Sequence, residues 1–172
     1  ATPEIYPLSL HAALPIYLIK LIEQSSRESS EFVDDLLNFA RVGQQALSLE
    51  NVDVTAVVKS AQSEFSLTYP AVSWTLNLLP DCEADPGLLR AVFANLLSNA
   101  YKFTSRESEP SIEVGSTDIK GEVAYYVRDN GVGFDMTESH RMFDVFERLH
   151  RPEDYPGTGA GLAIVRRIVE RH

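Results

Sequence analysis

DNGVG at residues 129–133 and GTGAGL at residues 157–162 are the two glycine-rich stretches that decide the fold of this chain. Glycine lets backbone N–H groups approach a phosphate without a Cβ clash. The second stretch leads into an apolar, helix-like segment at residues 162–169, whose amino-terminal end would face an anion. Either stretch alone also fits a hairpin turn or an ordinary loop. Together they predict a seat for the phosphates of a nucleotide, and the nucleotide expected is ATP.

A helix expected over residues 88–103 carries the next signal. Its apolar residues recur at helical spacing on one stripe, and these are Leu89, Val92, Phe93, Leu96 and Ala100. Asn95, Asn99 and Lys102 recur at i, i+4 and i+7 on a neighbouring stripe. Asparagine disfavours helix interiors because its side chain competes for backbone hydrogen bonds. Two asparagines one turn apart therefore indicate a binding task, although a solvated helix face is the plainer alternative.

Four motifs occur in the order and with the spacing of a known family. NLLSNAYKFT (95–104), DNGVGF (129–134), FDVFER (143–148) and GTGAGL (157–162) closely resemble the N box, first glycine box, F box and second glycine box of sensor histidine kinases. Upstream, DDLLNFARVG (34–43) resembles the end of that family's dimerisation hairpin. The stretch at 146–159 most resembles the lid of kinases related to bacterial phytochromes.

The resemblance implies an α+β fold, a two-layer α/β sandwich of the Bergerat (GHKL) type preceded by a long amphipathic helix. Residues 17–50 would be the second helix of the dimerisation hairpin, and residues 51–172 the ATP-binding catalytic domain. By the same resemblance, the first helix of the hairpin and the last strands of the sandwich are expected to be missing here. Residues 1–16 have three prolines and no sustained periodicity. They partly resemble translated sequencing-adaptor sequence and stay unassigned.

The resemblance also implies a role for individual residues. Asp129 would accept the adenine amino hydrogen, and Asn99 would supply one oxygen to Mg²⁺. Asn95 and Lys102 would contact the phosphates, and Arg148 would reach the terminal phosphate from a mobile lid at residues 136–156. Phosphoryl transfer would therefore depend on Asn95, Lys102 and Arg148. The other nucleotide contacts implied by the motifs are Gly131, Gly133, Phe146, Gly157, Thr158, Gly159, Ala160, Gly161 and Leu162.

Two of these residues also have a plainer structural interpretation. Asp129 is well placed to close an Asx-turn with the glycine that follows two residues later. Arg148 has two carboxylates within reach along the lid, Glu147 and Glu153, and a surface ion pair with either is the alternative to phosphate binding. Both interpretations stay open from the sequence alone.

Composition limits the classes of partner. The formal charge of −10 and a pI near 4.8 argue against nucleic acid and against anionic lipid. Hydrophobic residues make up 44% of the chain, which suffices for a packed core. The single cysteine, Cys82, excludes an internal disulfide and shows no metal-ligand spacing. No apolar run approaches the ~20 residues that cross a bilayer. A cytoplasmic location without membrane contact is expected for this region.

The family's phosphoacceptor motif, similar to His-Glu-Leu-Arg-Thr-Pro, is absent from this sequence. His11 lacks the acidic neighbour and the arginine, His140 and His150 fall in the expected lid, and His172 is the last residue. The chain is therefore expected to bind ATP without accepting phosphate itself. The resemblance implies that the parent protein forms a homodimer, phosphorylates a histidine and passes the phosphate to a response-regulator receiver domain.

Two other functions remain open. A GHKL-type ATPase of the gyrase or mismatch-repair type would need a glutamate to activate water, and this chain has Asn95 at that place. A nucleotide-binding or dimerisation module without kinase activity would keep the same fold. Within that class, the helix ending at 34–43 disfavours a serine-kinase anti-sigma factor.

Local patterns predict the remaining elements. Helices are expected at residues 17–47 and from an N-cap at Thr55, and the helix over 88–103 should open with Asp85 as N-cap and Pro86 in its first turn. Strands are expected at about 72–78, 111–117 and 122–128, with a turn at 120–121 between the last two. Alternation places Leu78 on the apolar face of its strand. Phe143 and Phe146 are expected to anchor the lid.

Overall fold

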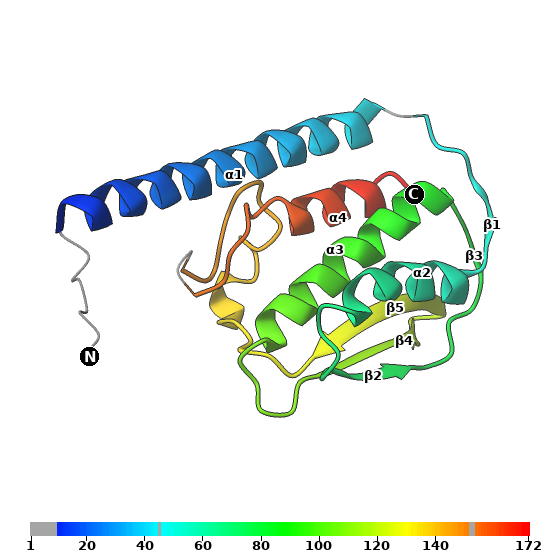
Figure 1. The fold of residues 1–172 in the computed structure, drawn as a ribbon. Coiled ribbons are helices and arrows are strands. Elements are labelled where there is room, and N and C mark those ends of the chain that lie inside the picture. The colour runs from blue at the N-terminus through cyan, green and yellow to red at the C-terminus, as the bar shows by residue number, and fades with distance from the viewer. Residues whose placement is uncertain (1–9, 45, 152–153) are drawn as a thin grey trace.

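A computed structural model describes residues 10–44, 46–151 and 154–172, with the side chains of residues 10–14 left out. The elements follow in the order α1 (Leu10–Gln44), β1 (Glu50–Val52), α2 (Val54–Ser66), β2 (Ser73–Leu76), β3 (Cys82–Ala84), α3 (Pro86–Thr104), β4 (Ser111–Ile119), β5 (Glu122–Asp129), a 3-10 turn η1 (Met136–Glu138) and α4 (Gly161–Val169). Helices α2 and α3 cover one face of the main sheet, α4 lies on α3, and α1 runs along the outside of α4 (Figure 1). The predicted α+β, two-layer architecture is confirmed.

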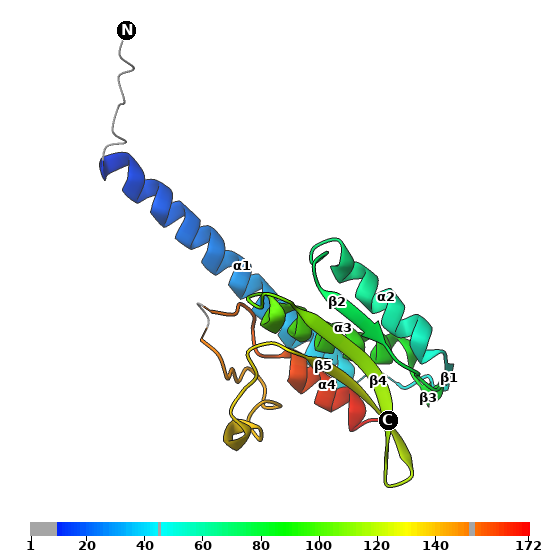
Figure 2. The ribbon, with the colours of Figure 1, turned by 90° about the horizontal axis from the view of Figure 1, so that it is seen from below.

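The main sheet has the strand order β2-β4-β5. β2 pairs with β4 in parallel, whereas β4 and β5 form an antiparallel hairpin (Figure 2). The hairpin turns at Lys120 and Gly121, whose φ angles of 58° and 89° lie in the left-handed region, so the predicted turn is confirmed. β1 and β3 form a separate two-stranded ribbon. β5 ends at Asp129, so the rest of the first glycine stretch follows directly after the end of this strand.

Helix α3 is buried on two sides, which the sequence pattern did not predict. Towards the sheet and α2 it buries Phe93, Leu97 and Tyr101, and towards α4 and α1 it buries Leu88 and Val92. The single apolar stripe expected along this helix was therefore incomplete, because a helix packed between two layers needs a wider apolar surface. α3 therefore packs against the sheet on one side and against α4 on another.

The start of α3 follows from its capping residues. Asp85 is 5% exposed and accepts a hydrogen bond from the Leu88 N–H at 3.0 Å, with Pro86 in the first turn, as predicted. The bond from Leu88 is the main cause of a lowered pKa at Asp85. The N-cap predicted for α2 was wrong, since Asp53 and not Thr55 accepts from the helix, at 2.9 Å from Ala56 N. Both helices that cover the sheet therefore begin at a carboxylate cap.

Two apolar residues lie outside the core against expectation. β2 ends at Leu76, and Leu78 beyond it is 81% exposed. Past the end of the strand the two-residue alternation no longer holds, and the adjacent Leu79 enters the core instead. Phe143, expected to anchor the lid, is 37% exposed. Of these two phenylalanines, Phe146 is the one that packs, among the described residues, against the buried cluster on the α4 side of α3.

Helix α1 starts earlier than the predicted residue 17 and ends earlier than residue 47. Its carboxyl-terminal part is packed on the domain: Val42 is buried, and Phe39 lies with its ring 5.9 Å from the Arg167 guanidinium. Its amino-terminal half exposes apolar side chains, among them Ile16, Ile19 and Ile22. Within the described part of the chain, no helix combines the length and apolarity needed to cross a bilayer. Of the segment left unassigned, residues 1–9 lie outside the described residues.

Candidate nucleotide-binding site

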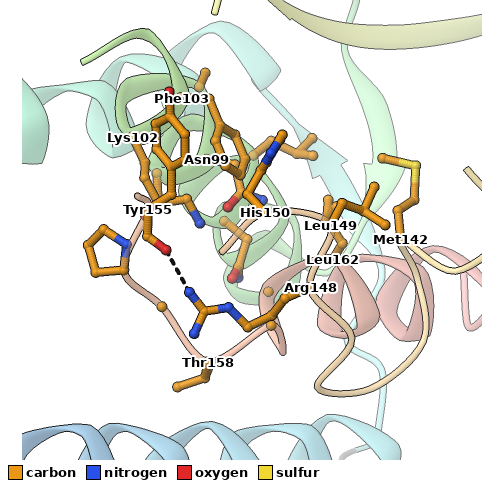
Figure 3. A pocket seen from close by; sticks show the side chains of 18 of the residues that line it. Asn99, Lys102, Phe103, Met142, Arg148, Leu149, His150, Tyr155, Thr158 and Leu162 are labelled. Atoms are coloured by element: carbon orange, nitrogen blue, oxygen red, sulfur yellow. Dashed lines mark hydrogen bonds between the residues drawn. The ribbon is translucent and has the colours of Figure 1, made fainter. Parts of the chain in front are cut away.

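A cavity of about 710 Å³ lies between α3, the end of β5, the segment from Met142 to Leu162, and α1 (Figure 3). Its size falls in the range of small-molecule sites. Twelve of the predicted site residues line it: Asn95, Asn99, Lys102, Asp129, Gly131, Gly133, Arg148, Gly157, Thr158, Gly159, Gly161 and Leu162. The fold therefore gathers all four sequence motifs around one cavity.

The polar stripe of α3 forms one wall of this cavity. Asn95, Asn99 and Lys102 are all half-buried there. Asn95 donates its amide N–H to the Ala91 carbonyl at 2.8 Å. Its amide oxygen faces the start of α4, where a Cβ atom at position 161 would lie only 2.9 Å away, so Gly161 gives this oxygen its space. The three side chains line the cavity, and Asn95 and Lys102 lie beside Gly161 and Gly157, so an open solvated helix face does not describe them.

Asp129 is the last residue of β5 and the first residue of the first glycine stretch. One of its oxygens, Oδ1, accepts a hydrogen bond from the Gly131 N–H at 2.9 Å, so the Asx-turn interpretation holds for that oxygen. Asn130 fixes the turn from the other side by accepting from Ser111 N at 2.8 Å and donating to the Glu109 carbonyl at 2.9 Å. The second oxygen of Asp129 accepts no hydrogen bond from the described residues, and the side chain lines the cavity. A ligand donor can therefore meet it.

Lys102 and Arg148 face the same cavity from opposite walls (Figure 3). Burial lowers the pKa of Lys102, and the nearby Arg148 guanidinium lowers it further. In the described ranges neither cation forms an ion pair, and the expected alternative is wrong for Glu147, which pairs with Arg141 at 2.7 Å. Glu153 lies outside the described residues. Two close cations that have no carboxylate partner among the described residues are an arrangement that a bound anion stabilises.

The second glycine stretch contributes mainly backbone atoms to the cavity wall. Gly157 and Gly159 have φ angles of 137° and 84°, and a Cβ atom at position 159 would lie 2.7 Å from the Glu147 carbonyl oxygen. Only glycine fits there. Helix α4 follows at Gly161. Its N-cap residue, Ala160, has no side-chain acceptor for the N–H groups of the first turn, and the Ala160 N–H itself donates to the Thr158 hydroxyl at 3.3 Å. Uncapped N–H groups at a helix start favour an anion, so the helix faces the cavity as a phosphate seat would.

Two predicted binding residues lie outside the cavity lining. Ala160 is fully buried among the residues between α3 and α4. Phe146 has a positive φ of 66° and packs its ring 4.3 Å from the Phe32 ring of α1. Both support the lining segment by packing, and neither is one of the described residues that face the cavity.

Other lining residues had no signal in the sequence analysis. Helix α1 contributes Glu31, Asp34 and Asp35, and the Asp35 carboxylate accepts a hydrogen bond from the Thr158 hydroxyl. Tyr155, 7% exposed, accepts a hydrogen bond through its carbonyl from Arg148 at 2.6 Å. The contact between Asp35 and Thr158 joins residues 123 positions apart, so no local pattern could reveal it.

The donor set fits a metal that is shared with a ligand. No group of three or more His, Cys, Asp or Glu side chains suited to a metal occurs in the part of the chain that the structure describes. Mg²⁺ keeps several waters and binds through phosphates with one or two protein ligands. A single amide oxygen from Asn99 meets that requirement.

Comparison with known proteins places this geometry in a family. The family model described as "Histidine kinase-, DNA gyrase B-, and HSP90-like ATPase" matches residues 84–172. The chain belongs to this family. The matched part of this ATPase-family chain contains α3, the β4–β5 hairpin, the lid and α4, and thus every predicted site residue.

Relatives of this chain include phytochromes and phytochrome-like proteins of cyanobacteria. Cyanobacterial phytochrome A of Nostoc sp. is 36% identical over 81% of this chain and 18% of its own length. Phytochrome-like protein Cph1 of Synechocystis sp. is 34% identical over 81% of this chain and 19% of its own length. The chain thus spans about a fifth of the length of these relatives. The sequence-based identification as the ATP-binding catalytic region of a sensor histidine kinase, of the phytochrome-related type, agrees with them.

Solved structures give the same result. The mycobacterial sensor histidine kinase MprB superposes with a TM-score of 0.64 at 27% identity, covering 73% of this chain and 80% of that one. Full-length ShkA, solved in complex with AMPPNP, superposes with a TM-score of 0.67 at 29% identity, covering 96% of this chain and 35% of that one.

Proposed function

We propose that this chain binds Mg²⁺ and ATP in the cavity between α3 and the lid and presents the γ-phosphate to a histidine. The observation that carries the proposal is the pair formed by Lys102 and Arg148, two cations that face each other beside the uncapped start of α4. An anion of several charges satisfies both cations and the free N–H groups together. ATP also fits the family to which the chain belongs.

Each cavity wall then has a role. The free oxygen of Asp129 accepts from the adenine amino group, which distinguishes adenine from guanine. Asn95 and Lys102 hold the phosphates from α3, and Arg148 approaches the terminal phosphate from the lid. Asn99 offers its oxygen to Mg²⁺, which would neutralise charge on the phosphates and promote transfer.

A water-activating ATPase is the competing function, and the site lacks its base. At the place of the required glutamate stands Asn95, an amide that does not accept a proton and whose N–H is bound to Ala91. Slow hydrolysis is therefore expected. A module that only dimerises would not explain why Lys102 and Arg148 both line the cavity.

The partners follow from the parent reaction. We propose that the exposed apolar residues of α1 belong to the dimerisation hairpin of a homodimer, that the acceptor histidine comes from that hairpin, and that a response-regulator receiver domain takes the phosphate. No sequence in this chain resembles the acceptor motif, and His11 is among the side chains that the structure leaves undescribed.

Titration calorimetry with ATP in the presence of Mg²⁺ tests the proposal. Saturable binding is expected, and Lys102→Gln should weaken it by about tenfold or more through loss of a charge-assisted contact. Lys59→Gln, at an exposed site on α2 that is not among the described lining residues, is a control for the loss of one positive charge. An absence of ATP binding by the unsubstituted, folded chain would contradict the proposal.

A further inference from the structure

Arg106 lies outside every recognised motif, two residues beyond the end of α3, and it binds two consecutive residues of the lid. Its Nη1 lies 2.9 Å from the Asp154 carboxylate, and its Nη2 donates to the Asp154 carbonyl at 2.9 Å. Its guanidinium also lies 4.9 Å from the centre of the Tyr155 ring. An exposed ion pair alone stabilises little. The planar Arg106 guanidinium, however, binds the Asp154 carboxylate and the Asp154 backbone oxygen together, and it thereby fixes the position of that backbone.

Tyr155 is held from its other sides by aromatic rings. Its ring centre lies 5.3 Å from that of Phe103 and 5.4 Å from that of His150, and it is 7% exposed. Arg106 therefore adds a third contact to a tyrosine ring that already packs against two others. The backbone of Tyr155 has a defined position as a result.

That backbone position matters because the Tyr155 carbonyl accepts from Arg148. The Nη2 to oxygen distance is 2.6 Å (Figure 3). The guanidinium of Arg148 has five N–H donors in one rigid plane, so binding one of them orients the whole group. Figure 3 shows the guanidinium between Tyr155 and Thr158, inside the predicted phosphate end of the cavity.

We propose that Arg106 is a positioning residue, which acts through Asp154 and Tyr155 to hold Arg148 where it meets the terminal phosphate of the nucleotide. The inference rests on the proposed function. Its specific consequence concerns discrimination, because ADP lacks the phosphate that Arg148 is placed to meet. Loss of Arg106 should reduce the preference for ATP over ADP and leave recognition of the adenine unchanged.

A double-mutant cycle tests this chain of contacts. Dissociation constants for ATP and ADP with Mg²⁺ are measured by calorimetry on the unsubstituted chain, Arg106→Ala, Arg148→Ala and the double variant. Arg106→Ala should lower the ATP-over-ADP preference by about 3- to 10-fold. In the Arg148→Ala background the same substitution should change the preference no further. Arg106→Lys should recover little, since an ammonium group cannot form the fork.

Two further variants secure the interpretation. Asp154→Ala removes the carboxylate that Arg106 binds and should act in the same direction, with circular dichroism verifying the fold. Arg166→Ala removes an exposed ion pair on α4, at 2.7 Å from Glu170, and should change neither affinity.

Failure of the positioning role can be distinguished from failure of the proposed function. Equal weakening of ATP and ADP by Arg106→Ala, or the same loss of preference after Arg148 is gone, would overturn the positioning role while the proposed function stands. A folded, unsubstituted chain that binds neither nucleotide would overturn both.

Discussion

Asp129→Asn separates the two oxygens of one carboxylate. In the structure one oxygen accepts from the Gly131 N–H at 2.9 Å, and the other faces the cavity. Asparagine keeps an oxygen for the turn and places an NH₂ group at the cavity. This NH₂ group cannot form a hydrogen bond with the adenine amino group, because both are donors. The turn should survive, and adenine recognition should be lost.

The expected loss follows from the value of one hydrogen bond. A bond to a charged acceptor contributes about 1.5–3 kcal/mol, which corresponds to roughly 10- to 150-fold in the dissociation constant for ATP. The carboxylate of Asp129 is exposed in the free chain, so water competes for it, and the lower end of the range is expected. Titration calorimetry on both chains measures the change, and circular dichroism verifies that the fold is retained.

Asp118→Asn is a matched control. Asp118 makes the same kind of turn contact at the other end of the β4–β5 hairpin, accepting from the Gly121 N–H at 2.9 Å. It does not line the cavity among the described residues, so its substitution should leave ATP affinity unchanged. Unaltered affinity in Asp129→Asn, or an equal loss in Asp118→Asn, would refute the reasoning and leave Asp129 with a turn role alone.

Three other predictions concern the metal, the fold and the reaction. Asn99→Ala should weaken Mg²⁺-dependent ATP binding by about tenfold and leave metal-free ADP binding unchanged; equal shifts in calorimetry would count against a metal ligand. Asp85→Ala should lower the free energy of unfolding in urea by about 1–2 kcal/mol at neutral pH. Because the bond from Leu88 lowers the pKa of Asp85, its contribution is present above about pH 4 and fades as the pH falls through the lowered pKa, so the two stability curves should converge in acid. Incubated alone with Mg²⁺ and γ-labelled ATP, the chain should acquire no acid-labile phosphate, and label on any of its four histidines would reveal an acceptor.

Local signals in the sequence predicted the parts of the fold that depend on neighbouring residues. The cap at Asp85, the turn at Lys120 and Gly121, and the polar stripe on α3 each arise within a few positions, where backbone geometry restricts the choice of residue. The motif resemblance then placed twelve candidate residues around one cavity.

Contacts between distant segments could not be predicted in this way. Leu97 and Tyr101 belong to the core because the sheet and α2 cover one side of α3, and Leu88 belongs to it because α4 covers another side. The bond between Asp35 and Thr158 joins residues 123 positions apart. Helical spacing states which residues share a face, and it does not state how many faces a neighbour will cover.

The burial of Val42 has a consequence for how the molecule folds. This residue of α1 shares a cluster with Leu88 and Val92 of α3 and with Ile164 and Val165 of α4. The junction between the helix and the domain is therefore not a boundary of cooperativity, since unfolding the last turns of α1 exposes apolar surface on the helix that carries the asparagines. In hydrogen exchange, the amides around Val42 should open together with those of α4, whereas the exposed middle of α1 should open independently and sooner.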